Sequence, residues 1–151
     1  MQTRRETLQR SVAVAGLLAA AGFPQFAQAA FNKTAFEAKS VPDAIKATGA
    51  ATLLESKDVI LTAPDIAENG AVVPMGVSTA LPGVKHLLLL VEKNPLALVA
   101  LFHSSESLEN NFLTRAKMGQ TSDVYAVAVM ADGKALWAKK EVKVTLGGCG
   151  G

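Results

Sequence analysis

The residue best suited to chemistry is a single thiol near the end of the sequence. Cys149 is the only cysteine among 151 residues, and it stands between two pairs of glycines, Gly147-Gly148 and Gly150-Gly151. A thiol forms bonds to sulfur that thiol–disulfide exchange can reverse, and glycines leave the surrounding backbone free to turn. Glycines also have no bulk, so such a tip could enter a narrow cleft in another protein. The pattern predicts a flexible arm over residues 147–151 that presents a sulfur atom.

The residues alone leave several roles open for Cys149. It could carry a sulfur cargo, form an intermolecular disulfide, or belong to an inert tail. A catalytic cysteine is not favoured, because nothing holds a base beside a flexible arm. A single cysteine also excludes an internal disulfide framework, a Cys-based zinc site and a covalently attached haem.

The other residues with metal-binding or cofactor-binding side chains show no supporting pattern. His86 and His103 lie at the ends of predicted strands without an HxxxH spacing or a neighbouring carboxylate pair, so structural or surface roles are expected. Met75, Met118 and Met130 lie among apolar strand-like runs, where core packing is expected. No glycine-rich segment joins a strand to a helix as a phosphate site would require. We therefore expect no metal, no cofactor and no catalytic residue in this chain.

Residues 1–29 have the three parts of an export signal. Arg4-Arg5 precede an apolar run at 11–21, and Ala27-Gln28-Ala29 form a small-x-small ending. The apolar run is shorter than the about 20 residues that a membrane-spanning helix needs. The paired arginines favour the twin-arginine export route. We expect cleavage after Ala29 and a mature protein in the periplasm.

Composition limits the partners of the mature chain. Beyond residue 29 there are 12 basic and 12 acidic residues, so the mature chain is formally neutral. Neither a nucleic acid nor a membrane surface is favoured as a partner. The length and the 50% apolar content suit a single core. We expect one domain over residues 30–146, followed by the arm.

The domain should begin with a short helix. Ser40 is a candidate N-cap three residues before Asp43, Pro42 suits the first turn, and Gly49 suits a left-handed stop. Two short apolar runs follow at 52–54 and 59–61, on either side of a turn, and are expected to form a pair of strands.

The remaining pattern is strand-like throughout. Pro74 interrupts an apolar run, which predicts an edge strand or a bulge. Asp132-Gly133 predicts a hairpin between the last two strands, and alternation around Val142 and Val144 predicts one solvated face. Further runs occupy 86–91, 96–102 and 112–118. Seven or eight short strands favour an all-β, immunoglobulin-like antiparallel sandwich with a short N-terminal helical segment.

The chain resembles the SoxY family of bacterial thiosulfate-oxidation proteins along almost its whole length. The terminal GGCGG sequence after an exported β-rich chain is the most specific part of the resemblance. Shorter segments occur in the order expected for the family: 68–70, 73–74, 93–96, 117–124 and 139–146.

The resemblance implies a covalent carrier and not an enzyme. Cys149 would be the attachment point for sulfur intermediates, and a SoxZ subunit would complete a heterodimer. A haem cytochrome would load thiosulfate, and a manganese-dependent hydrolase would release sulfate. The resemblance also admits a sulfane-sulfur dehydrogenase as a further partner. The competing interpretation is an immunoglobulin-like binding module whose tail cysteine forms an intermolecular disulfide.

Overall fold

The computed structural model describes residues 32–145, which form two helices and nine strands. The predicted export signal, residues 1–29, and the predicted arm, residues 147–151, lie outside the described residues. Within the described part, no helix has the length and apolar character needed to cross a membrane. The bounds of the elements are α2 Lys33–Glu37, α3 Val41–Ala47, β1 Thr52–Glu55, β2 Val59–Thr62, β3 Ile66–Ala67, β4 Val73–Thr79, β5 Val84–Val91, β6 Leu98–His103, β7 Asn111–Ala116, β8 Ser122–Met130 and β9 Lys134–Val144.

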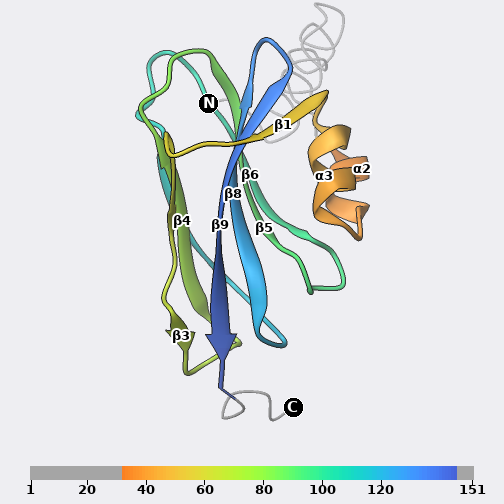
Figure 1. The fold of residues 1–151 in the computed structure, drawn as a ribbon, viewed down its shortest axis with the longest axis vertical. Coiled ribbons are helices and arrows are strands. Elements are labelled where there is room, and N and C mark those ends of the chain that lie inside the picture. Colours follow the sequence, from red (N-terminus) through yellow and green to blue (C-terminus); the bar gives the residue numbers. More distant parts are fainter. Residues whose placement is uncertain (1–31, 146–151) are drawn as a thin grey trace, which may run out of the picture. The chain divides into compact units, whose positions relative to one another are not determined.

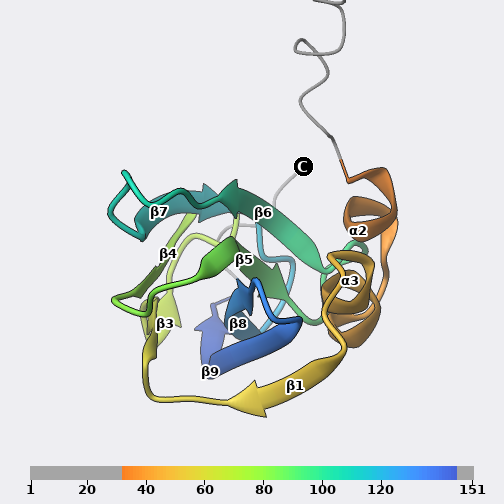
Figure 2. The ribbon, with the colours of Figure 1, turned by 90° about the horizontal axis from the view of Figure 1, so that it is seen from above.

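The strands form two sheets that face each other. The larger sheet has the order β1-β9-β8-β5-β6, with β3 also paired to β9, and the smaller sheet has the order β2-β4-β7. Helices α2 and α3 cover the opposite face of the larger sheet, so that this sheet is the middle of three layers (Figures 1 and 2). This arrangement confirms the immunoglobulin-like β-sandwich with a short N-terminal helical segment. The strands of the sandwich are mostly antiparallel, and β9 adds parallel pairings with β1 and β3.

The sequence of strand β5 contains a continuous apolar run because both faces of this strand are covered. Leu87 and Leu89 pack into the core between the two sheets, whereas Leu88 and Leu90 pack against the helices. All four side chains are fully buried. Because successive strand residues point to opposite faces, a strand with both faces covered has no polar alternation.

The predicted short helix is confirmed as α3. The Ser40 hydroxyl accepts a hydrogen bond from the Asp43 backbone N–H at 3.3 Å, and Gly49 has a φ of 91° after the helix end. The sequence interpretation missed α2. Asn32 caps that helix by accepting a hydrogen bond from the Ala35 N–H at 3.0 Å, a preference that Asn shows at N-caps.

The predicted pairing of residues 52–54 with 59–61 is wrong. Strand β1 pairs in parallel with β9, and β2 pairs antiparallel with β4 in the other sheet. Hydrogen bonds at the two ends of the connection explain the separation. The Ser56 N–H donates to the Trp137 carbonyl at 2.9 Å, and the Thr79 hydroxyl donates to the Asp58 carbonyl at 2.7 Å. The connection therefore crosses between the sheets and is not a hairpin turn.

The edge-strand prediction for Pro74 needs a correction. Strand β4 is the central strand of the smaller sheet, but its pairing with β2 ends at Gly76. Pro74 is therefore paired only with Arg115 on the β7 side. One flank of β4 is unpaired at this position, which is where a residue without an N–H is tolerated.

The last two strands follow the prediction closely. Strands β8 and β9 are antiparallel neighbours joined through Gly133, which has a φ of 87°. Val142 is fully buried, whereas Glu141 and Lys143 on either side are exposed. The core role expected for the methionines is also confirmed, since Met75 and Met118 are buried and the half-buried Met130 packs against the core.

Candidate functional site

The structure describes the base from which the predicted arm extends. Strand β9 is the longest strand of the described part, and it ends at Val144 beside the short strand β3 (Figure 1). The Thr145 N–H donates to the Ala67 carbonyl at 3.1 Å, and the Lys143 N–H donates to the Asp65 carbonyl at 3.0 Å. These bonds hold β9 against the 65–67 segment up to the last described residue.

The loop between β7 and β8 holds the same end of β9. The Val144 N–H donates to the Thr121 hydroxyl at 3.0 Å. In the same loop, the Met118 N–H donates to the Gly70 carbonyl at 2.7 Å, which joins the loop to the segment after β3. The end of β9 is therefore hydrogen-bonded to two segments that are distant from it in sequence.

The β5–β6 loop joins this group. The Asn94 side-chain amide donates to the Lys117 carbonyl at 2.8 Å, and the Lys93 N–H donates to the Ser122 hydroxyl at 3.0 Å. Segments 65–70, 93–94, 117–122 and 143–145 thus lie together, and we call them the arm base. Most of the segments that carry the family resemblance contribute to it.

One ion pair supports the arm base from the side. The Lys140 ammonium lies 2.6 Å from an Asp65 carboxylate oxygen and donates to the Ala63 carbonyl at 3.0 Å. This hydrogen bond and the nearby positive charge lower the pKa of Asp65. Because Asp65 is exposed, the pair orients the segment before β3 more than it stabilises the fold.

The arm base carries exposed side chains of both charges, with Asp65 and Glu68 among the acidic ones and three lysines among the basic ones. Lys93, Lys117 and Lys143 are exposed, and none of them forms an ion pair with another described residue. An anion brought to this end of the molecule would meet cations that are not already paired.

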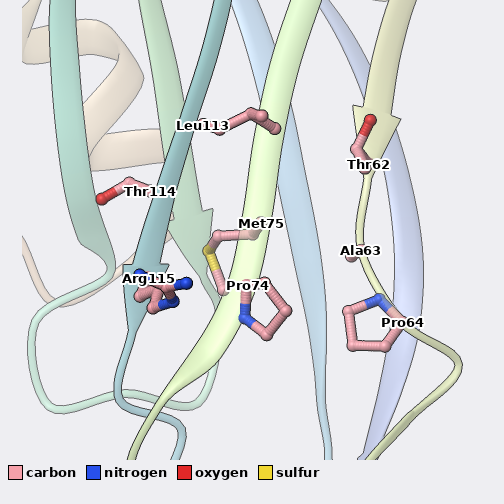
Figure 3. Close-up of a pocket in the computed structure, with 8 residues that line it drawn as sticks. All are labelled: Thr62, Ala63, Pro64, Pro74, Met75, Leu113, Thr114 and Arg115. Carbon is pink, nitrogen blue, oxygen red and sulfur yellow. The ribbon is translucent and has the colours of Figure 1, made fainter.

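A hollow opens beside the smaller sheet, with a volume of about 740 Å³. It lies where β2 and β4 diverge, and Figure 3 shows Pro64 and Pro74 on opposite sides of it. Met75, Leu113 and Arg115 also line it. No sequence signal indicated this hollow, because it arises where β2 ends at Thr62 and leaves the first residues of β4 without a partner on that side.

None of the predicted site residues lies in the part of the chain that the structure describes. Cys149 and the glycines Gly147, Gly148, Gly150 and Gly151 lie outside the described residues. Sequence reasoning gave no structural role to Thr121, whose hydroxyl accepts a hydrogen bond from the Val144 N–H, or to Asp65, which pairs with Lys140. Contacts between residues so far apart in the chain leave no local pattern.

The two histidines, for which the sequence predicted structural or surface roles, lie side by side. His86 on β5 and His103 on β6 are register partners. Elsewhere in the described part, no three His, Cys, Asp or Glu side chains form a group that could hold a metal ion.

Comparison with known proteins connects this geometry to a family. A model of the family described as sulfur oxidation protein SoxY matches residues 44–149. The solved structure of the sulfur carrier protein SoxY from Chlorobium limicola f thiosulfatophilum is 33% identical. That match has a TM-score of 0.64 and covers 71% of this chain and 97% of the other.

Other matches are more distant. A superoxide reductase (neelaredoxin) from Ignicoccus hospitalis is 18% identical with a TM-score of 0.51, covering 68% of this chain and 87% of the other. At that identity the likeness is one of fold alone. No curated protein matches the chain. The family match covers the sandwich, the arm base and Cys149, and the chain therefore belongs to the SoxY family of sulfur oxidation proteins.

Proposed function

We propose that this protein is a periplasmic carrier that holds sulfur intermediates covalently on Cys149 and presents them to separate enzymes. The observation that carries the proposal is the arm base. Strand β9 is hydrogen-bonded to the domain up to Thr145, only four residues before the single thiol. At ~3.3–3.6 Å per residue, Cys149 can reach about 13 Å from that point.

The proposed chemistry begins with an oxidative conjugation. The Cys149 thiol and the outer sulfur of thiosulfate form an S–S bond, with loss of the thiol proton and transfer of two electrons to a haem cytochrome. Water then attacks the terminal sulfonate group in a manganese-dependent hydrolase. That step breaks the other S–S bond, releases sulfate and a proton, and leaves a persulfide on Cys149. The unpaired lysines of the arm base are compatible with an anionic cargo.

The proposed partner enzymes each carry out one step that the carrier itself does not catalyse. A SoxZ subunit would form the working heterodimer, the cytochrome and the hydrolase would act on the arm in turn, and a sulfane-sulfur dehydrogenase could oxidise the remaining sulfur. A carrier of this kind needs no cofactor of its own, and neither nucleic acid nor a membrane is proposed as a partner.

The test uses the protein purified from cells that grow on thiosulfate. Intact-mass analysis should find sulfur adducts on the wild type and none on Cys149→Ser. The substitution should leave the free energy of unfolding within about 0.5 kcal/mol of the wild type, as for ordinary surface changes. Adducts of unchanged abundance on Cys149→Ser would exclude the carrier role.

A second function for the thiol is an intermolecular disulfide on a binding module. The same preparation distinguishes it, because electrophoresis without reductant would show a linked dimer as the main species. Co-expression with the SoxZ subunit should instead give a 1:1 complex in analytical ultracentrifugation, and a strictly monomeric chain would contradict the proposed partner.

The proposed location depends on the export signal. N-terminal sequencing of the periplasmic protein should begin at Ala30 or within a residue or two of it. Retention of residues 1–29 on the periplasmic protein would contradict the signal assignment without affecting the role of Cys149.

A further inference from the structure

The two histidines of the sequence meet on neighbouring strands of the middle sheet. His86 on β5 and His103 on β6 are direct register partners, so both side chains lie on the same face. Their ring centroids are 4.8 Å apart, with an interplanar angle of 81°. The Cβ atoms of directly opposed strand residues are typically about 4.5–5.5 Å apart. Two imidazoles attached at that separation can bind one metal ion.

The surroundings of His86 favour its binding to a metal ion. Its Nδ1 atom is buried and has no hydrogen-bond partner, which is uncommon for a buried polar atom. Burial, His103 and Lys85 lower the pKa of His86, which favours the neutral ring. A neutral imidazole has a free lone pair on one nitrogen, and this is the form that binds metals. His103 is exposed, so its ring can turn toward an ion without disturbing the core.

We propose that His86 and His103 form a binding site for a divalent transition metal such as Zn²⁺, with water completing the coordination. Imidazole nitrogens suit Zn²⁺, Cu²⁺ and Ni²⁺, at about 2.0–2.1 Å for zinc. No third side chain of the ligand types forms a group with them in residues 32–145. The site is therefore open and weaker than a four-ligand structural site, and it can exchange its metal.

This site is separate from the carrier arm. His86 is level with Val129 on β8, which is level with Ala135 near the start of β9. Thr145, just past the end of β9, is ten residues further along the chain than Ala135, a distance of about 33 Å at ~3.3 Å per residue. The four residues from Thr145 to Cys149 reach only about 13 Å. The thiol of the same chain therefore does not contribute to the histidine site.

The experiment measures zinc binding to the mature protein by isothermal titration calorimetry in a Cys149→Ser background, which removes the thiol as a competing ligand. We expect one zinc ion per chain. Loss of an outer-shell partner alone typically weakens a metal site about 10–100-fold. His103→Phe, which keeps a ring at this position and removes its nitrogens, should therefore weaken binding by at least about tenfold.

A matched control and a spectroscopic readout complete the test. Lys85→Gln changes a neighbouring charge and no ligand, so it should bind zinc as well as the background protein or more tightly. In NMR spectra of the Cys149→Ser protein, which keeps both histidines, zinc should shift the ring signals of His86 and His103. Zinc binding that is unchanged in His103→Phe, or the absence of binding in the Cys149→Ser protein, would overturn the proposal. Either result would leave the carrier role of Cys149 untouched.

Discussion

Gly70 lies against Val144, the last residue of β9, with no room for a side chain between them. A Cβ atom on Gly70 would lie 2.8 Å from Val144 Cγ1 and 2.5 Å from the Met118 carbonyl oxygen. The Met118 N–H also donates to the Gly70 carbonyl. Because one of the two close neighbours is a backbone atom, no simple side-chain rotation would make room. Only glycine allows this loop to pack against the end of β9.

Gly70→Ala should therefore destabilise the protein by about 1–3 kcal/mol, the usual effect of forcing extra atoms into a packed site. Gly119→Ala, in the neighbouring β7–β8 loop, is the control, because its added Cβ would meet nothing within 4 Å. That variant should stay within about 0.5 kcal/mol of the wild type. Urea unfolding measures both. Equal stabilities for the two variants would show that the loop moves away freely.

The two faces of β5 should contribute comparable stability. Leu88→Ala and Leu89→Ala remove fully buried side chains from the helix layer and from the inter-sheet core, respectively. Each should lower the free energy of unfolding by about 2–5 kcal/mol. Leu113→Ala, at a side chain that is 72% exposed, should change it by no more than about 0.5 kcal/mol. A near-neutral Leu88→Ala would mean that α2 and α3 do not form a packed layer.

Protonation of Asp65 should contribute to the loss of folding stability at acidic pH. The Lys140 hydrogen bond lowers the pKa of Asp65 in the folded protein. The resulting stabilisation is present above the unfolded-state pKa of about 3.9 and is lost as pH falls through the lower folded value. Thermal unfolding from about pH 7 to about pH 3 should therefore decline less steeply for Asp65→Asn than for the wild type.

Lys140→Met should reduce the same acid-induced loss, because it removes the partner of Asp65. Glu106→Gln serves as the control, since Glu106 is exposed in the β6–β7 loop and forms no ion pair with a described residue. If Asp65→Asn and Lys140→Met both keep the full acid dependence of the wild type, the ion pair does not stabilise the fold.

Widening the arm should separate small-molecule reactivity from enzymatic loading. Replacing Gly148 and Gly150 with Val keeps Cys149 but adds bulk and stiffness, because β-branched residues restrict the chain. Reaction with a small thiol reagent should proceed at a near-normal rate. Loading and unloading by the proposed partner enzymes should slow. Equal enzymatic rates for this variant and the wild type would mean that the tip does not enter a narrow cleft.

The features that the sequence predicted well depend on residues close together in the chain. Ser40, Asp43 and Gly49 bound one helix through local capping, and Asp132-Gly133 join two strands through local turn geometry. The alternation around Val142 reports the burial of one strand face. The thiol and its glycines are likewise one local pattern, and its family resemblance is confirmed by a match that includes Cys149.

Only the tertiary structure decided which distant segments meet. Nothing in residues 52–55 shows that β1 pairs in parallel with β9 and not with β2. Likewise, a glycine at position 70 does not show that Val144 will lie against it. The histidines are separate in sequence, and the register of β5 and β6 alone makes them neighbours. Apolar burial, which drives these pairings, depends on total area and not on direction, so it selects a sandwich without specifying its strand order. Strand order and register are set by the long-range hydrogen bonds and close contacts of the folded chain.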